Sequence, residues 1–584
     1  MYKKGNIYRT HYTSELEKTM VGERVRLSGW ISSIRNHGGV VFIDLRDFYG
    51  LMQIVIYGEE KYQKLSREST ITVEGVIRER TPENVNPKLK SGEIELVVEE
   101  LEVLGQCKSM LPFEIAESTK VSEEVRLKYR YLDLRNEKMK ENLITRSKVV
   151  SYARQLMGEL GFLEITTPIL TSSSPEGARD YIVPSRLHPG QFYALPQAPQ
   201  QFKQLLMCSG VDKYFQIAPC FRDEDARADR CPGEFYQLDM EMAFATQEDV
   251  FAVMEEVLPK IFERYGKYKV DQVPFVRIPY TESLERFGTD KPDLRNPIEC
   301  VNLTSIFEKC GFKAFEGKAV KAICVSTIGQ PRSFYDSLEE YMVKNGAKGM
   351  AWIRVDEDKL TGPIVKFLSE EQISQIIGKC KAKLGDTIFF SASTYKEATK
   401  LIGILRTELG KRLGLIEEGV YKFCWVVDFP MYEVNEETRK IDFCHNPFSM
   451  PKGGLKALET EDPLHIIAEQ FDIIVNGIEL SSGAVRNADP RTLVKAFEIA
   501  GYSEKDVQEK FSALYTAFQY GAPPHAGVAP GIDRMVMLLC GEESIREVVP
   551  FPMNKKAQDL MMGAPGFVTE KQLREVHIHV NTIK

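Results

Sequence analysis

Alternating apolar and polar residues form short runs through the first hundred positions of the chain. Residues 25–31 show this pattern, and further short apolar runs follow, separated by turn signals such as His37-Gly38-Gly39. A period of two predicts strands with one buried face. The predicted strands cover residues 25–31, 40–45, 51–56, 71–77 and 94–104. Five short strands in one small segment are typical of a closed barrel, with the OB-fold as the natural candidate.

After residue 135 the pattern changes to a mixture of helix and strand. Apolar side chains at helical spacing predict a helix over residues 141–160 that ends at Gly161. Strand-like runs follow at residues 214–218 and 235–242. The polar and charged stretch 111–135, between the barrel and this helix, is interpreted as a hinge.

Residues 293–419 have another texture, with many Lys and Glu. Helical patterns (370–384, 396–414) alternate there with strand patterns (320–325, 351–355, 387–390). We interpret the segment as an α+β domain inserted into an α/β body that resumes at residues 421–428. The expected fold class is therefore multidomain α/β. Its predicted parts are a barrel (1–110), a hinge (111–135), a first body segment (136–292), the insertion (293–419) and a second body segment (420–584).

Composition places the chain among ordinary globular proteins. Its 584 residues allow about three to five domains. Hydrophobic residues at 43% and charged residues at 27% exclude disordered, collagenous and disulfide-scaffold classes. No apolar run approaches the roughly 18 residues of a membrane span. The first residues lack an apolar signal segment and the eleven Cys form no CxxC pair, so free thiols in the cytoplasm are expected.

The net charge of −8, from 76 Lys and Arg against 84 Asp and Glu, by itself speaks slightly against nucleic acid binding. Residues 1–110 are nevertheless neutral, with equal numbers of basic and acidic side chains. Several arginines lie on or beside the predicted strands, and Phe42 and Trp30 are candidate stacking faces for bases. Taken alone, the arginines are better explained as a solvated strand face.

Three blocks stand out chemically, although no P-loop, Rossmann GxGxxG, HExxH or GxSxG is present. Residues 161–170 run from a helix end into a strand, and residues 221–224, Phe-Arg-Asp-Glu, follow a strand. Residues 527–534 form a Gly-spaced turn before an apolar helix. Singly, they are explained by a packing turn, a surface ion pair and a loop-to-helix junction. In this order they resemble the three motifs of class II aminoacyl-tRNA synthetases.

Seven segments extend the resemblance over essentially the whole chain: residues 174–180, 194–206, 221–230, 444–448, 477–480, 485–486 and 524–527. They are similar to aspartyl-tRNA synthetases of the bacterial type. In that family an OB barrel, a hinge, a class II catalytic domain with an antiparallel sheet flanked by helices, and an inserted GAD domain make up the chain. The resemblance implies an aspartate–tRNA ligase that uses ATP and Mg²⁺.

The resemblance implies roles for residues at the nucleotide end of the site. Arg222 would neutralise the α-phosphate of ATP, Glu224 would accept a hydrogen bond from the adenine amino group, and Arg534 would hold the γ-phosphate. The implied ATP contacts are Arg222, Asp223, Glu224, Glu479, Gly531, Ile532, Asp533 and Arg534. Asp472 and Glu479 would ligate Mg²⁺. Without the resemblance, Asp472 would be interpreted as a surface helix carboxylate.

The implied aspartate contacts are Glu176, Gln200, Lys203, Arg222, Asp239, His445 and Arg486. Glu176 and Gln200 would hold the α-amino group. Lys203, oriented by Asp239, and Arg486 would pair with the side-chain carboxylate, because an anionic side chain needs cations. Asparagine would be rejected because a neutral amide leaves buried cations unpaired.

The implied reaction requires no general base. The α-carboxylate of aspartate is already a nucleophile at pH 7, so the site positions it and stabilises charge. Its attack on the α-phosphorus gives aspartyl-adenylate and pyrophosphate, and the 3′-hydroxyl of the terminal tRNA adenosine then attacks the acyl carbon. Cys231 departs from the family pattern, since many relatives carry there a Gln that contacts ATP and Cys is a weak hydrogen-bonding substitute.

In the family the barrel reads the anticodon. Phe42 matches a residue that stacks on an anticodon base, Gln53 one that bonds the central U, and Arg35 a neighbouring contact. His37 and Asn84 match positions tied to the choice of tRNA. Relatives that charge both tRNA-Asp and tRNA-Asn tend to carry His at the first position, and strict relatives tend to carry Leu. His37 therefore favours a non-discriminating enzyme, which implies a downstream amidotransferase acting on Asp-tRNA-Asn. The alternatives are strict tRNA-Asp specificity and an ordinary turn histidine.

Other interpretations remain beside this one. Asparaginyl- and lysyl-tRNA synthetases share the barrel and the three motifs, but neither usually has the insertion, and lysyl enzymes should surround the substrate side chain with acidic groups. A catalytically dead tRNA-binding paralogue should have lost its motif residues, yet Arg222, Glu224, Glu479 and Arg534 are present. Block 161–170 matches the motif that forms the class II dimer interface, so a C2 homodimer is expected.

Overall fold

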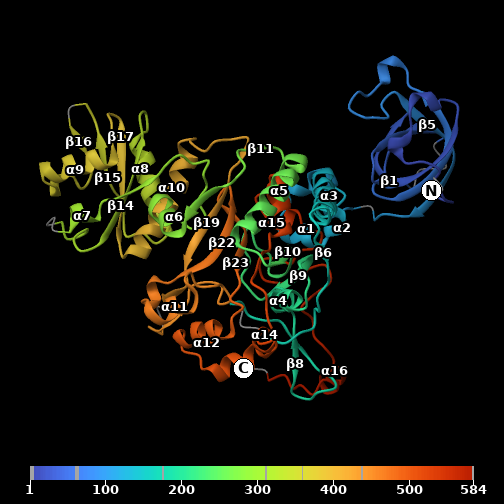
Figure 1. Ribbon diagram of the computed structural model, residues 1–584. Helices are drawn as coiled ribbons and strands as arrows, with labels where there is room; N and C mark the ends of the chain where they lie inside the picture. The colour runs from blue at the N-terminus through green and yellow to red at the C-terminus, as the bar shows by residue number, and fades with distance from the viewer. Residues whose placement is uncertain are drawn as a thin grey trace. The chain divides into compact units, whose positions relative to one another are not determined.

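The computed structural model describes residues 5–58, 65–108, 110–173, 177–308, 312–357, 359–435 and 438–581. The chain divides into two compact units, Met1–Glu117 and Ser118–Lys584 (Figure 1). The border between them falls inside the stretch interpreted as a hinge.

The N-terminal unit is a closed barrel in the order β1-β2-β3-β5-β4, as predicted. Its strands are β1 (Arg24–His37), β2 (Val40–Arg46), β3 (Leu51–Tyr57), β4 (Thr70–Glu79) and β5 (Ile94–Gly105). Alternate side chains point inward and build a buried core of Val, Leu, Ile and Met. β1 pairs with β4 through its first half and with β2 through its second half, so this one long strand closes the barrel.

Gly75 marks a close approach of β4 to β5. A Cβ at this position would lie 1.9 Å from the carbonyl oxygen of Val97. The pairing of the two strands shifts register between Glu74 and Gly75. The missing side chain therefore lets the strands approach each other where the barrel bends.

The C-terminal unit is built on an eight-stranded sheet in the order β12-β19-β22-β23-β24-β10-β9-β6. The strands are β6 (Leu163–Glu164), β9 (Lys213–Arg222), β10 (Gly233–Ala243), β12 (Val276–Pro279), β19 (Phe423–Pro430), β22 (Ile467–Val475), β23 (Ile478–Val485) and β24 (His525–Val528). The six central strands are antiparallel, whereas β12 and β6 at the two edges run parallel to their neighbours. The centre of the sheet is therefore antiparallel and flanked by helices, as expected, and parallel pairing is confined to its two edges.

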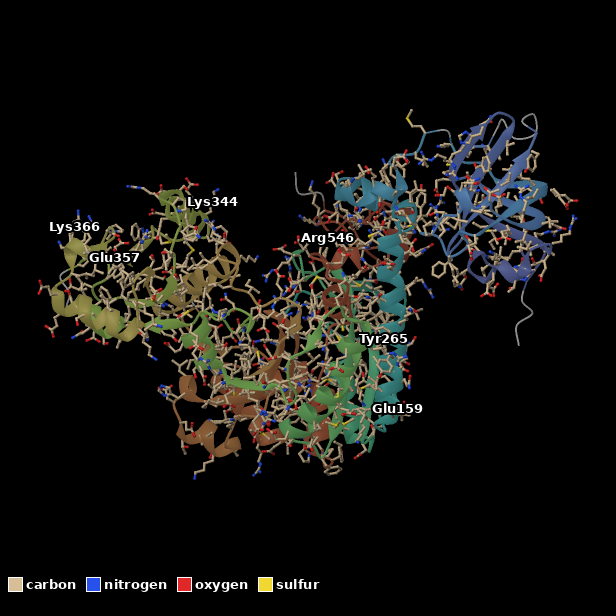
Figure 2. The ribbon with its side chains drawn as sticks, turned by 90° about the horizontal axis from the view of Figure 1, so that it is seen from above. Glu159, Tyr265, Lys344, Glu357, Lys366 and Arg546 are labelled. Atoms are coloured by element: carbon tan, nitrogen blue, oxygen red, sulfur yellow. The ribbon has the colours of Figure 1, made fainter. Side chains whose placement is uncertain are left out.

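Three helices cover one face of this sheet: α3 (Glu137–Glu159), α5 (Gln247–Tyr265) and α15 (Ile532–Cys540). α3 and α5 run side by side, with their last residues, Glu159 and Tyr265, at the same end of the pair (Figure 2). Leu238, Met240 and Met242 on β10 pack into this helical layer. Because side chains alternate along a strand, Asp239 and Glu241 point to the opposite face. α4 (Gln200–Cys208) packs on β10 and β9 at that second face.

A smaller sheet in the order β13-β14-β17-β15-β16 lies within the segment interpreted as an insertion. Its strands are β13 (Cys300–Asn302), β14 (Ala319–Ser326), β15 (Ala351–Val355), β16 (Leu360–Thr361) and β17 (Asp386–Ser393). Helices α8 (Arg332–Lys344) and α10 (Tyr395–Arg412) cover one face. Helices α7 (Thr304–Phe307) and α9 (Glu370–Cys380) cover the other. α9 ends earlier than predicted because Lys381 adopts the left-handed conformation, with φ +50°.

The remaining elements connect these layers. They are α1 (Glu123–Lys128), α2 (Arg130–Asp133), α6 (Tyr280–Phe287), α11 (Gly454–Thr460), α12 (Pro490–Ile499), α13 (Glu504–Lys510), α14 (Ser512–Phe518), α16 (Glu570–Glu575), β7 (Ile182–Pro184), β8 (Phe192–Ala194), β11 (Lys269–Val270), β18 (Val420–Tyr421), β20 (Tyr432–Val434) and β21 (Ile441–Phe443). Across the described ranges, no helix has the length and apolar character that crossing a membrane would require.

The close approach at Gly75 predicts that Gly75→Ala destabilises the barrel on the order of 2–3 kcal/mol, because the added Cβ forces β5 to move. Gly158→Ala in α3 is the matched control, since a Cβ there meets nothing within 4 Å and Ala favours a helix. Urea unfolding of the full chain measures both. Equal effects of the two substitutions would contradict the steric explanation.

Candidate functional site

A cavity of about 550 Å³ lies on the sheet face opposite α3, α5 and α15. β9, β10, β23 and the first residues of α4 and α15 contribute to its lining. It brings together most of the sequence-predicted site residues: Gln200, Lys203, Arg222, Glu224, Asp239, His445, Glu479, Arg486, Gly531, Asp533 and Arg534. Asp223, Ile532 and Asp472 do not line it, and Glu176 lies outside the described residues.

A row of four buried charges underlies one end of the cavity. Lys203 Nζ lies 2.5 Å from Asp239 Oδ1 and 3.5 Å from Glu241 Oε2. Glu241 accepts two hydrogen bonds from Arg486, from Nε at 2.8 Å and Nη2 at 3.0 Å. Each of the four residues is at most 2% exposed. The signs alternate along the row, so every buried charge has an opposite neighbour.

Glu241 is a site residue that the motif comparison missed. Burial acts to raise the pKa of its carboxyl group, but attraction by Arg486 and Lys203 outweighs burial and the pKa is lowered. The acid two residues after Asp239 in a predicted strand was the available signal, because residues two apart share a face. Gly527 makes room for this arrangement, since a Cβ there would lie 2.0 Å from Glu241 Oε2.

The row leaves polar atoms for a ligand. Asp239 Oδ2 and Gln200 Nε2 are buried and make no hydrogen bond of good distance and angle in the described structure, and the Tyr214 hydroxyl is near enough to Asp239 to act on its pKa. The described hydrogen bonds of Arg486 use Nε and Nη2 but not Nη1. Burial raises the pKa of Asp239, against the attraction of Lys203. An acceptor and a donor without partners, beside a second cation, fit a ligand that carries both an ammonium and a carboxylate.

The row also corrects one sequence-based argument. That argument held that a neutral substrate amide would leave Lys203 and Arg486 as unpaired cations. Both cations are already paired within the protein, with Asp239 and Glu241. Rejection of an amide therefore cannot depend on unpaired cations alone.

The other end of the cavity carries arginines. Arg222 stacks over the ring of Phe235 at 5.0 Å, and its Nε donates to Gln197 O at 3.3 Å. Arg534 donates to Glu479 O at 2.7 Å and to Asp229 O at 3.1 Å. These contacts hold the two guanidinium groups at the cavity wall, where they can bind phosphate oxygens.

Glu224 and Arg230 close the cavity at the loop between β9 and β10. Arg230 Nη1 lies 2.7 Å from Glu224 Oε2. Cys231, on the same loop, is buried, and burial raises the pKa of its thiol to about 12. The thiol is therefore neutral and packs with apolar neighbours, so it adds no charge to this end of the cavity.

Two carboxylates meet behind Arg534. Asp472, on β22, is buried, so the interpretation as a surface helix carboxylate is wrong. Burial and the neighbouring Glu479 raise the pKa of Asp472 well above its usual value. Ser482 donates to Asp472 at 2.6 Å, and Lys291 Nζ lies 3.2 Å from Glu479. No sequence signal pointed to Lys291, which comes from the connection into the insertion.

These carboxylates fit a divalent ion that is held mainly by a ligand. Among the described residues, no group of three or more His, Cys, Asp or Glu side chains could hold a metal ion. Mg²⁺ in nucleotide sites is usually bound through one or two carboxylates together with phosphates and water. Asp472 and Glu479, with repulsion between them, match that donor set.

The residues at the start of α15 have different surroundings. Asp533 forms an ion pair with Arg146 of α3 and accepts a hydrogen bond from Tyr236 N at 3.2 Å. Ile532 is fully buried in the helical layer. Gly531 lines the cavity, and a Cβ there would meet no described protein atom within 3.6 Å. The glycine thus leaves space on the cavity side.

His445 is a further lining residue of the cavity, whereas Gln197 does not line it and contacts Arg222 through its carbonyl oxygen. His445 packs edge-on against Phe429, with ring centroids 5.0 Å apart. Gln197, which sequence reasoning did not single out, donates to Ala178 O at 2.9 Å and to Asp180 Oδ1 at 2.5 Å. Its amide therefore anchors the chain that follows residues 174–176. Asp223 lies outside the cavity, 3.7 Å from Arg179.

The outer face of the barrel carries a separate polar ladder with one side chain from each strand. Arg35 pairs with Asp44 at 2.7 Å and donates to Gln53 at 3.3 Å. Gln53 donates to Glu95 at 2.8 Å, and Arg78 pairs with Glu95 at 2.5 Å. The ladder crosses β1, β2, β3, β5 and β4 in their order in the sheet. It fixes two of the three predicted anticodon residues on one surface.

Phe42, the third predicted anticodon residue, lies beside this ladder. Phe42 is the cross-strand partner of Arg35, and its ring packs edge-on against His37, with centroids 5.9 Å apart. Asn84 lies in the connection between β4 and β5 and donates to Thr81 at 2.9 Å. His37, the last residue of β1, therefore contacts the ring that is predicted to stack on an anticodon base.

Comparison with protein families gives two matches. Residues 122–555 match the model described as tRNA synthetases class II (D, K and N). Residues 25–104 match the model described as OB-fold nucleic acid binding domain. Together these matches include the barrel, the cavity and the small sheet.

Full-length relatives carry two related names. The chain is 56% identical over 579 residues to an aspartate–tRNA ligase of Streptomyces avermitilis, covering 98% of each chain. It is 53% identical over 590 residues to an aspartate–tRNA(Asp/Asn) ligase of Chlorobium phaeovibrioides, covering 99% of this chain and 98% of the relative. A solved structure of asparaginyl-tRNA synthetase from Pyrococcus horikoshii with asparaginyl-adenylate is similar in fold, with a TM-score of 0.57, 20% identity and coverage of 94% and 98%.

The buried row predicts that Glu241→Gln destabilises the protein by about 3–5 kcal/mol at pH 7, because Lys203 and Arg486 lose a shared partner. The pKa of Glu241 is lowered from 4.5, so its stabilising effect is fully present above about pH 4.5 and is lost as the pH falls through the lowered pKa. Urea unfolding at a series of pH values measures this difference.

Glu256→Gln serves as the control, because Glu256 forms an exposed pair with Lys260 on α5 and such pairs contribute little. A difference between Glu241→Gln and the unsubstituted protein that stays constant from pH 7 into the acid range would contradict a charged Glu241.

Proposed function

The chain belongs to the class II tRNA synthetases of the D, K and N group and, within them, to the aspartate–tRNA ligases; we propose that it activates L-aspartate with ATP and transfers it to tRNA. The observation that carries this proposal is the single cavity that joins the alternating buried charges to Arg222 and Arg534. The first end suits a small zwitterion with an acidic side chain, and the second suits a polyphosphate.

In the activation step, Arg222 stabilises charge on the α-phosphate while the α-carboxylate of aspartate attacks the phosphorus. Arg534 holds the γ-phosphate of a bent ATP, and Glu224 accepts a hydrogen bond from the adenine amino group. Gly531 leaves room for the nucleotide. The products are aspartyl-adenylate and pyrophosphate, and the 3′-hydroxyl of the terminal tRNA adenosine then takes the aspartyl group. No side chain needs to act as a general base.

For the amino acid, Asp239 Oδ2 accepts a hydrogen bond from the α-ammonium, with Gln200 beside it. Arg486 Nη1 and Lys203 bind the side-chain carboxylate. Asp239 Oδ2, Gln200 Nε2 and Arg486 Nη1 are the polar atoms left for a ligand, whereas Lys203 Nζ also pairs with Asp239. Because Glu241 fixes both cations, an asparagine amide would have to direct its NH₂ donors at groups that cannot accept a hydrogen bond. Glu176 and His445 complete the proposed set.

Asp472 and Glu479 would hold Mg²⁺ against the phosphates, where the ion supplies positive charge for the departing pyrophosphate. Lys291 and Ser482 hold these carboxylates in place in this structure. Asp533 and Ile532 act through packing, since one pairs with Arg146 and the other is buried.

The barrel reads the anticodon through Phe42, Gln53 and Arg35, with His37 and Asn84 in the choice of tRNA. The contact of His37 with Phe42 supports a role at the anticodon. Relatives with similar identity carry both the Asp name and the Asp/Asn name. We take the non-discriminating form, which charges tRNA-Asp and tRNA-Asn and leaves Asp-tRNA-Asn to an amidotransferase. A C2 homodimer through residues 161–170, a cytoplasmic location and the predicted division into barrel, hinge, split catalytic domain and insertion belong to the same proposal.

Arg222→Ala is expected to lower aspartate-dependent ATP–pyrophosphate exchange by about 100- to 1,000-fold, because a fixed positive charge at the α-phosphate is lost. Binding of tRNA, measured by filter retention, should remain. Arg179→Ala is the matched control, since Arg179 is exposed on a neighbouring segment of the same chain and does not line the cavity. Undiminished pyrophosphate exchange in Arg222→Ala would contradict the role of Arg222 at the α-phosphate. No pyrophosphate exchange by the unsubstituted protein would contradict the proposed ligase activity.

His37→Leu is expected to reduce charging of tRNA-Asn relative to tRNA-Asp by about tenfold, since the loss of one stacking or polar contact to a base costs on the order of 1–3 kcal/mol. Charging assays with the two purified tRNAs measure the ratio. His11→Leu, on the same unit, is the control. If the unsubstituted protein leaves tRNA-Asn uncharged, the strict alternative holds instead.

A further inference from the structure

The loop between β9 and β10, residues 223–232, forms one rim of the cavity and is called the rim loop here. It carries Glu224, Asp229 and Arg230, all of which line the cavity. Asp229 also contacts Arg534 through its carbonyl oxygen and, at 3.5 Å, its carboxylate. The position of the rim loop therefore sets both the adenine end of the cavity and the surroundings of Arg534.

The chain that follows α15 forms hydrogen bonds with the backbone of the rim loop. Ile545 N donates to Ala228 O at 2.8 Å. Arg546 Nη1 donates to Arg227 O at 3.1 Å. These two bonds reach adjacent carbonyl groups at the loop tip, where the chain turns between Arg227 and Arg230. Without them the tip would depend on its own short-range bonds and on Arg534.

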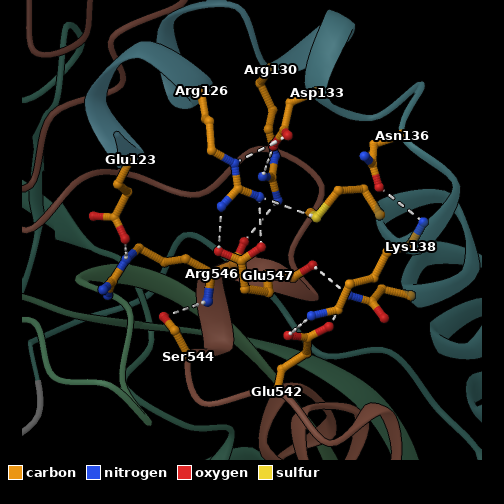
Figure 3. A network of polar contacts seen from close by, with 12 residues as sticks. Glu123, Arg126, Arg130, Asp133, Asn136, Lys138, Glu542, Ser544, Arg546 and Glu547 are labelled. Atoms are coloured by element: carbon orange, nitrogen blue, oxygen red, sulfur yellow. Dashed lines mark hydrogen bonds and ion pairs between the residues drawn. The ribbon is translucent and has the colours of Figure 1, made fainter. Parts of the chain in front are cut away.

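Arg546 is itself held in place from a third segment. Its Nε donates to Glu123 Oε2 of α1 at 2.9 Å. Its carbonyl oxygen accepts from Arg130 Nη2 of α2 at 2.7 Å. The residue is only 4% exposed. Figure 3 shows its guanidinium group directed at Glu123, away from Arg126 and Arg130.

Glu547, the residue after Arg546, anchors the segment that follows α15. Arg126 donates to both oxygens of Glu547, at 2.9 and 2.7 Å, and also contacts Asp133 (Figure 3). This pair joins α1 to the short helix Ile545–Glu547, but among the described residues neither Arg126 nor Glu547 forms a hydrogen bond with the rim loop. Of the arginines at this interface, Arg546 contacts the rim loop, whereas the described contacts of Arg126 and Arg130 are with other residues.

We propose that Arg546 is a positioning residue, which links α1 to the rim loop and holds the loop in the conformation that binds ATP. A planar guanidinium can bind the Glu123 carboxylate along one edge and the Arg227 carbonyl along another, which an ammonium group cannot do in the same geometry. The effect of Arg546 passes through the backbone of the loop and involves no contact with substrate. The kinetic part of this inference rests on the proposed function, whereas the contact of Arg546 with the loop does not.

The substitution Arg546→Lys tests the proposal, with Arg126→Lys as a matched control at the same interface. Arg546→Lys should raise amide hydrogen exchange of residues 223–232 about tenfold, because one charge-assisted hydrogen bond to the loop is lost. The KM for ATP in pyrophosphate exchange should rise by a similar factor, while kcat and the KM for aspartate stay within about twofold. Arg126→Lys should change none of these.

Glu123→Gln is the second variant, which keeps Arg546 and removes the charged partner of its guanidinium group. A smaller increase in both quantities is expected. Unchanged hydrogen exchange in Arg546→Lys, or equal changes in Arg126→Lys, would overturn the proposal. Faster amide hydrogen exchange in Arg546→Lys with an unchanged KM for ATP would overturn the proposal as well. Hydrogen exchange needs no activity, so failure of the positioning role is distinguishable from failure of the proposed function.

Discussion

Four charged side chains buried beneath one cavity are the constraint on which the catalytic unit depends. Asp239, Lys203, Glu241 and Arg486 are each at most 2% exposed, and an isolated charge at that depth would be strongly destabilising. Alternation of sign gives each charge an opposite neighbour. Alternation along β10 places both carboxylates on one sheet face and residues such as Leu238 in the helical layer. The apolar core and the polar site are therefore the two sides of one strand.

Residues from segments distant in the sequence hold the groups that form the wall of the cavity. Lys291, in the connection into the insertion, reaches Glu479. Arg146, in the helical layer, pairs with Asp533 at the start of α15. Arg546 bonds the rim loop in the same manner. In each case a cation outside the proposed substrate contacts holds a carboxylate of the cavity wall or a carbonyl group of the loop that carries lining residues. The layers that look structural therefore also set the geometry of the site.

The barrel shows why net charge misleads about nucleic acid. The whole chain carries −8, yet residues 1–110 are neutral. On the barrel surface Arg35, Gln53 and Arg78 are joined to acidic partners in one ladder across the strands. These pairs hold polar groups in fixed positions beside Phe42, which suits recognition of individual bases more than attraction of a phosphate backbone.

The sequence by itself determined the elements and the family. Its period of two predicted the barrel strands, and its motifs predicted Lys203, Arg222 and Arg486 as residues of one site, because both signals are local in the chain. Only the tertiary structure decided how those charges are compensated. Glu241 and Arg486 are 245 residues apart, and no local pattern relates them. The edge strands β6 and β12, likewise, run parallel to their neighbours because of chain connections, which periodicity does not encode.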